Sequence, residues 1–378
     1  MKIAVVDESL NAEFRVAITP ETVKKFIGLG AEISIQAHAG MASGILDTEY
    51  TASGATITKT AKDALKDADL VLKVRRPTDG EIKLIKKGAV VLAIMDPYGN
   101  EAALKALADA GLSAFAMELM PRITRAQSMD ILSSQANLAG YRAVVDASAL
   151  YGRSFPMMMT AAGTVPAARV FIMGVGVAGL QAIATARRLG AIVTATDVRP
   201  ATKEQVESLG AKFIAVEDDE FKQAETSGGY AKEMSKEYQD KQATLVSNHI
   251  AKQDIVITTA LIPGRPAPKL VTTTMVESMR AGSIVVDMAV ERGGNCELSK
   301  LGDVVEHKGV KIAGFDNLAG RMAATASSLY AKNLYTFAET LISKETKSLD
   351  INVDDELVKA TCLTRDGAII HLHFQPKL

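Results

Sequence analysis

Polar side chains that could hold a polar ligand are concentrated in the run from Glu118 to Arg142. Its spacing predicts a single helix, because apolar residues recur at every third or fourth position and so share one face. The apolar face carries Met129, Leu132, Ala136, Ala139 and Ala143. The opposite face carries Gln127, Asp130, Ser134 and Asn137.

The composition of this polar face favours a ligand over bulk solvent. Short Ser, Asn and Asp side chains are poor helix formers, because they compete for backbone hydrogen bonds. Lys and Glu, the usual solvent-facing helix residues, are absent from Pro121 through Arg142. A solvated helix face is the alternative interpretation. We expect instead a surface that hydrogen-bonds a polar molecule.

A glycine-rich turn supplies a second site with a defined chemistry. Gly174, Gly176 and Gly179 have the G-x-G-x-x-G spacing, between a predicted strand at 169–173 and a predicted helix at 180–189. The first glycine makes a tight turn, the second lets the backbone approach a pyrophosphate, and the third lets helix and strand pack closely. The helix N-terminus offers free N–H groups to the phosphates. A helix start that is glycine-rich by chance is the alternative.

An acidic residue ends the next predicted strand, at 192–196. Asp197 lies about 20 residues past the glycines, where a carboxylate hydrogen-bonds the ribose of adenosine. A carboxylate at this position repels a 2′-phosphate, so the sequence predicts NAD rather than NADP. Arg199 keeps NADP open as an alternative, since an arginine can accommodate that phosphate.

Strand-like and helix-like segments alternate along the chain and predict the elements that position these residues. A predicted helix at 20–30 has Thr19 as its cap and Pro20 in its first turn; another spans 100–110. The predicted strands are 3–6, 32–35, 70–74, 89–94 and 113–116, then 169–173, 192–196, 213–216, 254–257 and 283–286. Such β-branched runs between helices predict parallel sheets buried on both faces.

So many strands favour two doubly wound α/β domains over one sheet. We expect residues 1–137 and 321–378 to form the first domain and residues 138–320 the second. A C-terminal hairpin is expected at 349–378 with its turn at Thr364–Gly367, and His371 and His373 on one face of the last strand. Residues 217–253 are rich in charge and amide groups, with a loop expected first and a helix at 232–252.

The bulk composition excludes several classes of protein. A formal net charge of -1 argues against nucleic acid as a partner, since phosphate binding needs a basic surface. No apolar run approaches the ~18–20 residues of a membrane span, and the start of the chain has no signal-peptide pattern.

Cys296 and Cys362 are predicted to be buried apolar residues rather than a disulfide or metal pair. An H-x-H metal site at His371 and His373 is not expected, because no further ligand lies nearby. We expect a soluble cytoplasmic protein that can still dock onto a membrane partner.

Several long motifs in order resemble one family over nearly the whole chain. They are PRITRAQSMDILSSQANLAGYRAV, MTAAGTVPAARV, GVGVAGLQAIATARRLGA, TKEQVESLGAKF, TTALIPGRPAPKL and GGNCELS. The sequence resembles the NAD(H)-binding alpha component of proton-translocating nicotinamide nucleotide transhydrogenase, in the superfamily of alanine dehydrogenase. The resemblance implies a homodimer with NAD(H) in a cleft between two domains. It also implies direct hydride transfer to NADP+ on a partner component, with a membrane-spanning component that moves protons and holds the assembly on the cytoplasmic face of the inner membrane.

The resemblance also implies roles for individual residues, none of them a metal ligand. Arg122, Gln127, Asp130 and Ser133 would surround the nicotinamide and its ribose, as cofactor-binding and catalytic residues, with Gln127 extending toward the NADP(H) of the partner. Gly174, Gly176, Val177 and Gly179 would hold the pyrophosphate. The remaining cofactor contacts would come from Asp197, Val198, Arg199, Thr259, Ala260 and Leu261. Gly229 and Tyr230 would lie on a loop that closes over the nucleotide. Direct transfer between two nicotinamide rings needs geometry and no general base.

Two other functions remain as alternatives. Alanine dehydrogenase grips a carboxylate with an arginine and a lysine, and Arg15 and Lys73 stand where these belong. It also needs a histidine as acid and base, whereas residues 89–97 contain none and offer only Asp96. Arg15 and Lys73 are then expected to be ion-pairing residues. A non-catalytic NAD sensor is the second alternative, although it would not require the polar run.

Two segments depart from the family pattern. Val6–Glu8 lacks the expected Pro-Lys-Glu character, which puts a specific role for Asp7 or Glu8 in doubt. Asn317–Arg321 lacks the usual proline, so its contact with the nucleotide is not predicted.

Overall fold

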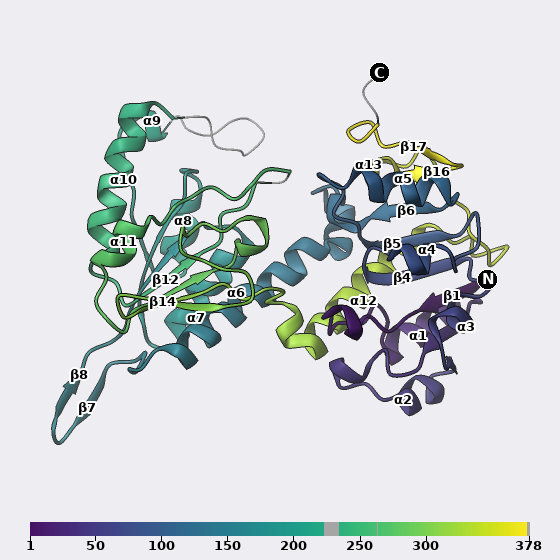
Figure 1. Cartoon of the computed structure of the whole chain (residues 1–378), viewed down its shortest axis with the longest axis horizontal. Helices are drawn as coiled ribbons and strands as arrows, with labels where there is room; N and C mark the ends of the chain where they lie inside the picture. The colour runs from purple at the N-terminus through teal and green to yellow at the C-terminus, as the bar shows by residue number, and fades with distance from the viewer. Residues whose placement is uncertain (223–233, 263, 376–378) are drawn as a thin grey trace. The chain divides into compact units, whose positions relative to one another are not determined.

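The β-branched runs form two separate, mainly parallel sheets, each with helices on both faces (Figure 1). The computed structural model describes residues 1–222, 234–262 and 264–375. The first unit comprises Met1–Gln135 and Ala319–Leu378, and the second comprises Ala136–Leu318. The junctions expected from the sequence were after residues 137 and 320. The two doubly wound α/β folds predicted from the sequence are confirmed.

The first unit is built on an eight-stranded sheet in the order β17-β16-β6-β5-β4-β1-β2-β3. Its strands are β1 Lys2–Val5, β2 Glu32–Gln36, β3 Thr56–Thr58, β4 Leu70–Arg75, β5 Val90–Ile94, β6 Ser113–Ala116, β16 Cys362–Arg365 and β17 Ala368–Ile369. Only β16 and β17 run antiparallel to their neighbours. Alternate residues of the central strands enter two different cores: Leu72 belongs to one and Val71 to the other. A sheet covered on both faces therefore explains the unbroken apolar runs.

Helices and single turns cover this sheet. They are α1 Pro20–Gly28, α2 Asp47–Ala52, α3 Ala61–Leu65, α4 Asp79–Ile82, α5 Glu101–Asp109, α12 Ala323–Thr340 and α13 Glu356–Thr361. Short 3-10 turns are η1 Ser9–Asn11, η2 Met41–Ser43, η3 Met117–Leu119, η4 Thr124–Met129 and η6 Gly320–Met322. Thr19 caps α1 by accepting a hydrogen bond from the N–H of Thr22, as predicted.

The second unit is built on a seven-stranded sheet in the order β11-β10-β9-β12-β13-β15-β14. Its strands are β9 Arg169–Met173, β10 Ile192–Thr196, β11 Lys212–Phe213, β12 Ile255–Thr258, β13 Ile284–Asp287, β14 Val304–His307 and β15 Val310–Ala313. Only β14 is antiparallel. The helices are α7 Val177–Arg188, α8 Thr202–Ser208, α9 Asp219–Lys222, α10 Lys236–Ile250 and α11 Thr273–Ser278, with the 3-10 turn η5 Val290–Arg292. Because β10, β9 and β12 are parallel neighbours, their carboxyl ends meet at one edge.

The prediction of one continuous helix through the polar run was wrong. The 3-10 turn η4 ends at Met129, and α6 spans Ile131–Leu150. Asp130 between them has an extended ψ of 95°, and its carboxylate accepts a hydrogen bond from the N–H of Ser133 at 2.9 Å. The carboxylate thus acts as a helix cap, which is the competition with helical structure that short polar side chains offer. The predicted apolar face is right in part: Met129 and Ala143 are buried, whereas Leu132 is 48% exposed.

The C-terminal hairpin was predicted correctly at its turn and wrongly at its end. Asp366 and Gly367 connect β16 to β17, and both have positive φ, as a two-residue hairpin turn requires. However, β17 ends at Ile369, so His371 and His373 do not alternate on a strand. The Nε2 atom of His371 lies 3.1 Å from the carbonyl oxygen of Ala360.

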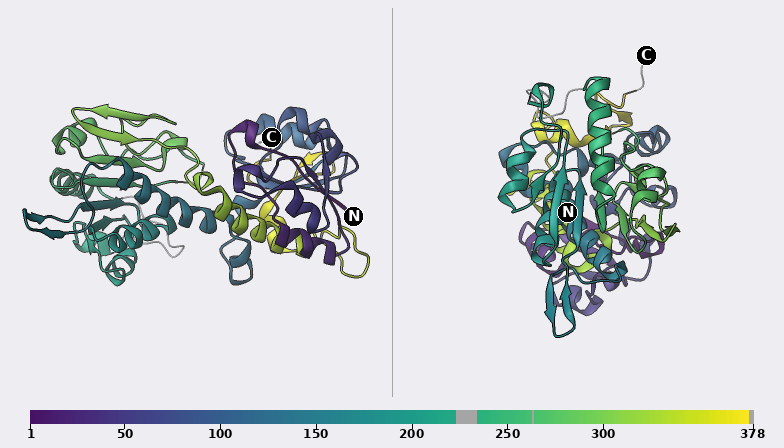
Figure 2. Two further views of the ribbon diagram at one scale, coloured as in Figure 1. Left: turned by 90° about the horizontal axis from the view of Figure 1, so that it is seen from below. Right: turned by 90° about the vertical axis from the view of Figure 1, so that its left-hand side faces the viewer.

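Further differences concern segments with weaker signals. The helix expected at 232–252 is α10, Lys236–Ile250, and the strand expected at 213–216 ends at Phe213. An exposed hairpin of β7 Met158–Thr160 and β8 Gly163–Val165, which was not predicted, projects from the second unit (Figures 1 and 2). Cys296 and Cys362 are buried, as expected, and both are free thiols. Among the residues that the structure describes, no helix has the length and apolar character that a membrane span requires.

A backbone contact between α6 and α7 provides a test of the fold of the second unit. A Cβ atom added at Gly140 would lie 2.1 Å from the carbonyl oxygen of Ala178, in the first turn of α7. We expect Gly140→Ala to force the two helices apart and to lower the free energy of unfolding by about 1–3 kcal/mol. Chemical denaturation measures this change. Gly152→Ala is the matched control, because its added methyl meets no atom of a described residue within 4 Å. Equal stability of the two variants would contradict the packing argument.

Candidate functional site

The glycine-rich turn lies at the carboxyl edge of the second sheet, between β9 and α7. Gly174 follows β9 directly, and its N–H donates to the carbonyl oxygen of Thr196 at 2.9 Å. Gly176 is the N-cap of α7, which begins at Val177, three residues before the predicted start. The strand–turn–helix context predicted for this motif is thereby confirmed.

At two of the three positions, Gly174 and Gly179, only glycine fits, because a Cβ atom would collide with the protein itself. A Cβ atom on Gly179 would lie 1.9 Å from the carbonyl oxygen of Gly174. One on Gly174 would lie 2.6 Å from the Oγ1 atom of Thr259, and Gly174 also has a positive φ of 102°. These contacts bring the first turn of α7 directly against the end of β9.

Gly176 has no such internal reason to be glycine. Its φ is -81°, which any residue can adopt, and no atom of the residues that the structure describes lies within 4 Å of an added Cβ. The first N–H groups of α7 have no intrahelical partner, as in any helix, and no side chain of a described residue caps them. A bare backbone beside open helix N–H groups is suited to an approaching phosphate.

Asp197 and Arg199 hold the glycine-rich turn from the end of β10. The Oδ2 atom of Asp197 accepts a hydrogen bond from the N–H of Val175 at 2.7 Å. The guanidinium of Arg199 binds both carboxylate oxygens, with Nε 2.9 Å from Oδ1 and Nη2 3.0 Å from Oδ2. Arg199 also donates to the carbonyl oxygen of Val175 at 3.2 Å. The sequence indicated a ribose ligand for Asp197 but not this second role in fixing the turn.

The segment Thr259–Leu261 follows β12. It is the third segment at this edge of the sheet, beside the glycine-rich turn after β9 and the Asp197–Arg199 pair after β10. The hydroxyl of Thr259 donates to the carbonyl oxygen of Gly174 at 3.0 Å. The fully buried Asn295 accepts from the N–H of Ala260 at 3.0 Å and donates to its carbonyl oxygen at 2.9 Å. Asp287, also fully buried, accepts from the N–H of Cys296. Sequence reasoning missed Asn295 and Asp287; the only signal was a polar residue inside Gly293-Gly294-Asn295-Cys296.

Exposed apolar side chains follow the carboxyl ends of the same three strands. They are Val177 after β9, Val198 after β10, and Leu261 and Ile262 after β12, with exposures of 37, 58, 53 and 47%. Large apolar side chains at a sheet edge that also carries open backbone N–H groups suit a ligand with both flat apolar and charged parts.

Two predicted cofactor contacts, Gly229 and Tyr230, lie outside the described residues. Asn317 lies in a turn of positive φ, 42°, and its N–H donates to Glu291.

The polar run of the first unit contains two kinds of residue. Arg122 and Gln127 are exposed, and their side chains make no hydrogen bond or ion pair with another described residue. Asp130 and Ser133 instead bind each other, with 2.5 Å between Oδ2 and Oγ. Asn333 of α12 fixes the junction by donating to the carbonyl oxygen of Ser128 at 2.7 Å. Arg122 and Gln127 are therefore exposed to solvent, whereas Asp130 and Ser133 are held in place by each other.

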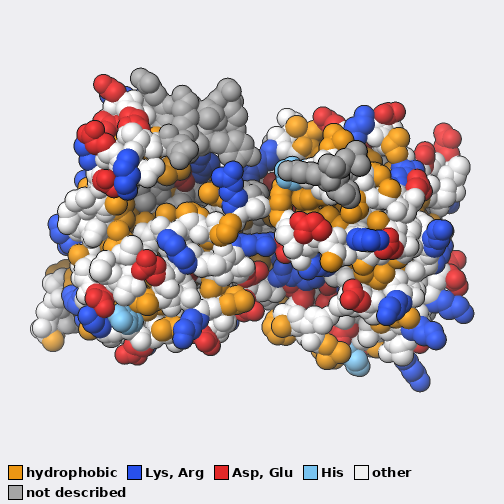
Figure 3. Space-filling view, turned by 45° about the horizontal axis from the view of Figure 1, so that its top comes forward, with side chains coloured by type: hydrophobic (Ala, Val, Ile, Leu, Met, Phe, Trp, Pro, Cys, Tyr) orange, Lys and Arg blue, Asp and Glu red, His pale blue; other side chains and the backbone are white. Residues whose placement is uncertain are grey.

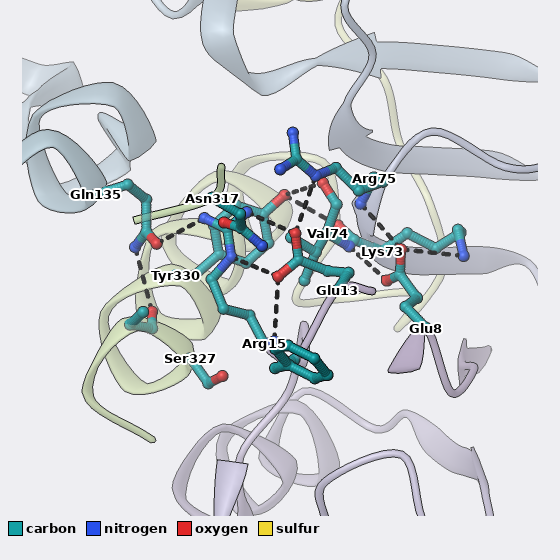
Figure 4. A network of polar contacts seen from close by, with 12 residues as sticks. Glu8, Glu13, Arg15, Lys73, Val74, Arg75, Gln135, Asn317, Ser327 and Tyr330 are labelled. Carbon is teal, nitrogen blue, oxygen red and sulfur yellow. Dashed lines mark hydrogen bonds and ion pairs between the residues drawn. The ribbon is translucent and has the colours of Figure 1, made fainter. Parts of the chain in front are cut away.

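A buried network of charges lies nearby in the first unit, and Figure 4 shows it at close range. Arg15 forms a two-pronged ion pair with Glu13, and its Nη1 atom donates to Gln135 at 2.9 Å. Lys73 pairs with Glu8 at 3.3 Å and with Glu81 at 2.8 Å. The expected ion pairing of Arg15 and Lys73 is confirmed, because each meets carboxylates of its own chain.

Glu8 has a definite structural role, which its departure from the family pattern did not predict. Its carboxylate is buried and accepts hydrogen bonds from the N–H groups of Val74 at 2.7 Å and Arg75 at 3.0 Å. Burial raises the pKa of Glu8 above its ordinary value, against the opposing charge of Lys73. The carboxylate connects the η1 turn to the end of β4.

The carboxylate of Glu13 has a strongly lowered pKa within this network. Burial raises the pKa of Glu13, but the hydrogen bonds and charge of Arg15, assisted by Arg75, outweigh burial and lower that pKa to about 2.

Among the described residues, no group of three or more His, Cys, Asp or Glu side chains could hold a metal ion. In the view of Figure 3, acidic and basic side chains are interspersed, in keeping with the net charge of -1.

The shifted pKa of Glu13 predicts how stability depends on pH. The folded pKa lies below the unfolded value of 4.5, so the stabilisation is present above pH 4.5 and is lost as pH falls toward 2. We expect Glu13→Gln to lower the free energy of unfolding at pH 7 by about 3 kcal/mol and to flatten its fall between pH 4.5 and 2. Denaturant titrations at several pH values measure both effects. Glu21→Gln, at an exposed ion pair with Lys25, is the control, and a similarly small effect of both variants would refute the prediction.

Comparison with known proteins places the chain among nicotinamide nucleotide enzymes. Two family descriptions match it: "Alanine dehydrogenase/PNT, N-terminal domain" over residues 4–139 and "Alanine dehydrogenase/PNT, C-terminal domain" over residues 143–372. The first part of the NAD(P) transhydrogenase subunit alpha of Rhodospirillum rubrum is 57% identical over 376 residues, which cover 98% of each chain. The structure of transhydrogenase from Sinorhizobium meliloti is 61% identical with a TM-score of 0.90, covering 98% of this chain and 100% of that one. A structure of L-alanine dehydrogenase is 26% identical with a TM-score of 0.81, covering 99% of this chain and 98% of that one. The chain therefore belongs to the NAD(P) transhydrogenase subunit alpha family, within the wider alanine dehydrogenase/PNT group.

Proposed function

We propose that the chain is the NAD(H)-binding subunit of a proton-translocating transhydrogenase. In this proposal a hydride passes directly from NADH on this chain to NADP+ on a partner component, and a membrane-spanning component couples the transfer to proton movement. The glycine-rich turn carries the proposal, because a Cβ atom added at Gly176 would meet no described atom within 4 Å, which leaves room at this backbone for a pyrophosphate. The names of the relatives support the reaction class.

The second unit would hold the pyrophosphate and adenosine. The N–H groups of Gly176 and Val177 would bind the pyrophosphate at the start of α7. Val198 and Leu261 would contact flat apolar parts of the dinucleotide, while Thr259 and Ala260 support its phosphates. Asp197 would contact the adenosine ribose, with the guanidinium of Arg199 neutralised against it, which favours NAD over NADP. We further propose that Gly229 and Tyr230 belong to a segment that excludes water when the nucleotide is bound.

The first unit would orient the nicotinamide. NADH, when bound, supplies the hydride, and the protein contributes position. Arg122 and Gln127 have side chains available for hydrogen bonds to a carboxamide or ribose. Asp130 and Ser133 are held by each other and by the cap of α6, so their remaining contacts are fixed in direction. Such preorganisation is what a transfer between two rings at ~3–3.5 Å requires.

Alanine dehydrogenase activity is less well supported by the first unit. Arg15 and Lys73 are satisfied by Glu13, Glu8 and Glu81. Residues 89–97 contain no histidine to shuttle protons. Asp96, the remaining candidate there, lies in a strained turn with φ of 48°, and its own N–H donates to Glu118.

The same proposal includes an assembly. We infer a homodimer that associates with an NADP(H)-binding component and a membrane-spanning component, on the cytoplasmic face of the membrane. The relatives' designation as an alpha subunit supports the existence of partner subunits.

A direct assay separates the candidate functions. We expect the purified chain to bind NADH, and to transfer hydride to an NADP analogue only after the NADP-binding component is added. We expect negligible reduction of pyruvate with ammonia. Stopped-flow absorbance follows transfer, and coupled product analysis follows alanine. Robust alanine formation would overturn the proposal, whereas NADH binding without transfer in the presence of the partner would support a sensor.

Gln127 provides a test of the positioning role. We expect Gln127→Asn to slow hydride transfer by about 10-fold or more while NADH affinity stays within about twofold, because a shortened amide loses the geometry of the reacting state. Single-turnover rates and equilibrium titration measure the two quantities. The control is Arg125→Gln, on the same turn but paired with Asp355 and Glu356. Equal losses of rate and affinity would assign Gln127 to binding instead.

A further inference from the structure

We propose that Asn333 of α12 is a positioning residue for hydride transfer, and that it acts through the turn η4, which carries Gln127. The inference rests on the proposed function and adds to it a buried side chain that acts on the reaction through another residue. The amide of Asn333 is the last link in a chain of hydrogen bonds that begins at a buried arginine and ends at the backbone of η4. The nicotinamide would then be oriented by groups fixed inside the first unit as well as by the exposed side chains of the turn.

A short hydrogen bond from Asn333 holds the backbone of η4. Its Nδ2 atom donates to the carbonyl oxygen of Ser128 at 2.7 Å, and the residue is only 7% exposed. The backbone hydrogen bonds at this junction are longer, with 3.4 Å from the N–H of Asp130 to the carbonyl oxygen of Gln127. The N–H of Ser134 lies 3.3 Å from the carbonyl oxygen of Asp130. The amide of Asn333 therefore compensates for weak backbone bonding where η4 meets α6.

Two buried neighbours and this hydrogen bond set the direction of Gln127. Ala126 and Met129 belong to the core of the first unit, whereas Gln127 and Ser128 between them are exposed. With the core residues packed inward and the carbonyl of Ser128 held by Asn333, the backbone is fixed on both sides of Gln127. A loosened carbonyl would let the exposed amide of Gln127 move while the turn stays in place.

The hydrogen bonds behind Asn333 form a continuous chain. The hydroxyl of Ser134 donates to Oδ1 of Asn333 at 2.8 Å, a shorter contact than its 3.2 Å to the carbonyl oxygen of Ile131. The same hydroxyl accepts from Nε2 of Gln135 at 3.3 Å. Oε1 of Gln135 accepts in turn from Nη1 of Arg15 at 2.9 Å, a contact that Figure 4 shows.

The two ends of this chain give every hydrogen bond in it one direction. Arg15 can only donate, and the carbonyl of Ser128 can only accept. The amides and the hydroxyl between them must therefore all donate toward Ser128. The NH2 group of Asn333 thus faces η4, because turning the amide over would place two acceptors together at one side and two donors at the other.

The other polar contacts of η4 with the rest of the unit lie at the surface. Arg125 pairs with Asp355 and Glu356, but its side chain is 46% exposed. Solvent screens such pairs, which therefore contribute little. The buried face of α12 instead bonds several segments, since Ser327 accepts from the N–H of Val16 and Asn333 donates to η4.

The test separates positioning from folding. Asn333→Leu keeps the branching of the side chain and removes the amide. We expect hydride transfer to slow by about 10-fold or more while NADH affinity stays within about threefold, because binding needs the turn and transfer needs its exact geometry. Single-turnover rates with the NADP-binding component present, and equilibrium titration of NADH, measure the two quantities.

Ser327→Ala is the matched control on the same buried face of α12. It removes hydrogen bonds with Val16 and Ser43 and leaves the contact with η4 in place. We expect its transfer rate to stay within about twofold of that of the unaltered chain.

A double-mutant cycle shows whether Asn333 acts through Gln127. In the Gln127→Asn background, adding Asn333→Leu should slow transfer by less than about twofold, because the side chain that it positions is already altered. Losses that multiply in full would instead mean that the two residues act independently.

Each outcome decides the inference. An unchanged transfer rate in Asn333→Leu would overturn it, as would independent losses in the cycle or an equal loss in Ser327→Ala. If Asn333→Leu does not fold, Ser134→Ala breaks the same chain one bond earlier, at a half-buried helix position, and is expected to lower the rate without lowering the affinity. Absence of transfer by the unaltered chain with its partner component would refute the proposed function itself and is recognised in the same assay.

Discussion

The candidate site of the second unit depends on one backbone contact, the approach of Gly179 to Gly174. A methyl group at Gly179 would lie 1.9 Å from the carbonyl oxygen of Gly174, so a side chain there is excluded. The contact sets the first turn of α7 against the end of β9 and aims its open N–H groups at the carboxyl edge of the sheet. A second close backbone contact packs α6 onto the same turn, because Gly140 lies against the carbonyl oxygen of Ala178 with no side chain between them. Helix position, and with it the direction of the N–H groups, therefore follows from two places where side chains are missing.

Buried polar groups then fix the loops that surround this turn. Asn295 holds Ala260 through both its N–H and its carbonyl oxygen, and Asp197 holds Val175. Each of these side chains is buried or nearly so, so an unmade hydrogen bond would be costly. Loops held by such hydrogen bonds suit the proposed hydride transfer, whose demand is geometric. The first unit uses the same strategy with full charges, where Glu13 and Glu8 compensate Arg15 and Lys73.

The sequence predicted elements with long, regular patterns better than it predicted short polar segments. The apolar runs at β4, β5 and β9 gave strands within a residue of their observed ends, because burial on both faces leaves no other role for such runs. The turn at Asp366 and Gly367 was predictable because few residues accept positive φ twice in succession. The helix through Asp130 was wrong, since helical periodicity gave no weight to a carboxylate that caps a new helix start. His371 and His373 were misplaced because two-residue alternation continues past the last ladder pair of β17.

By itself the sequence determined the doubly wound fold class, the glycine-rich turn and the family, since these depend on local pattern and on residue types at fixed spacing. Tertiary structure alone decided which polar groups are already satisfied. Arg199 was visible as a cation in the sequence, but its ion pair with Asp197 is set by the folded structure. Asn295 was an unremarked polar residue until its contacts with Ala260 were known. Compensation of charge and of hydrogen bonds is a property of neighbours in space, and residues such as Gln135 and Arg15 become neighbours only after the chain has folded.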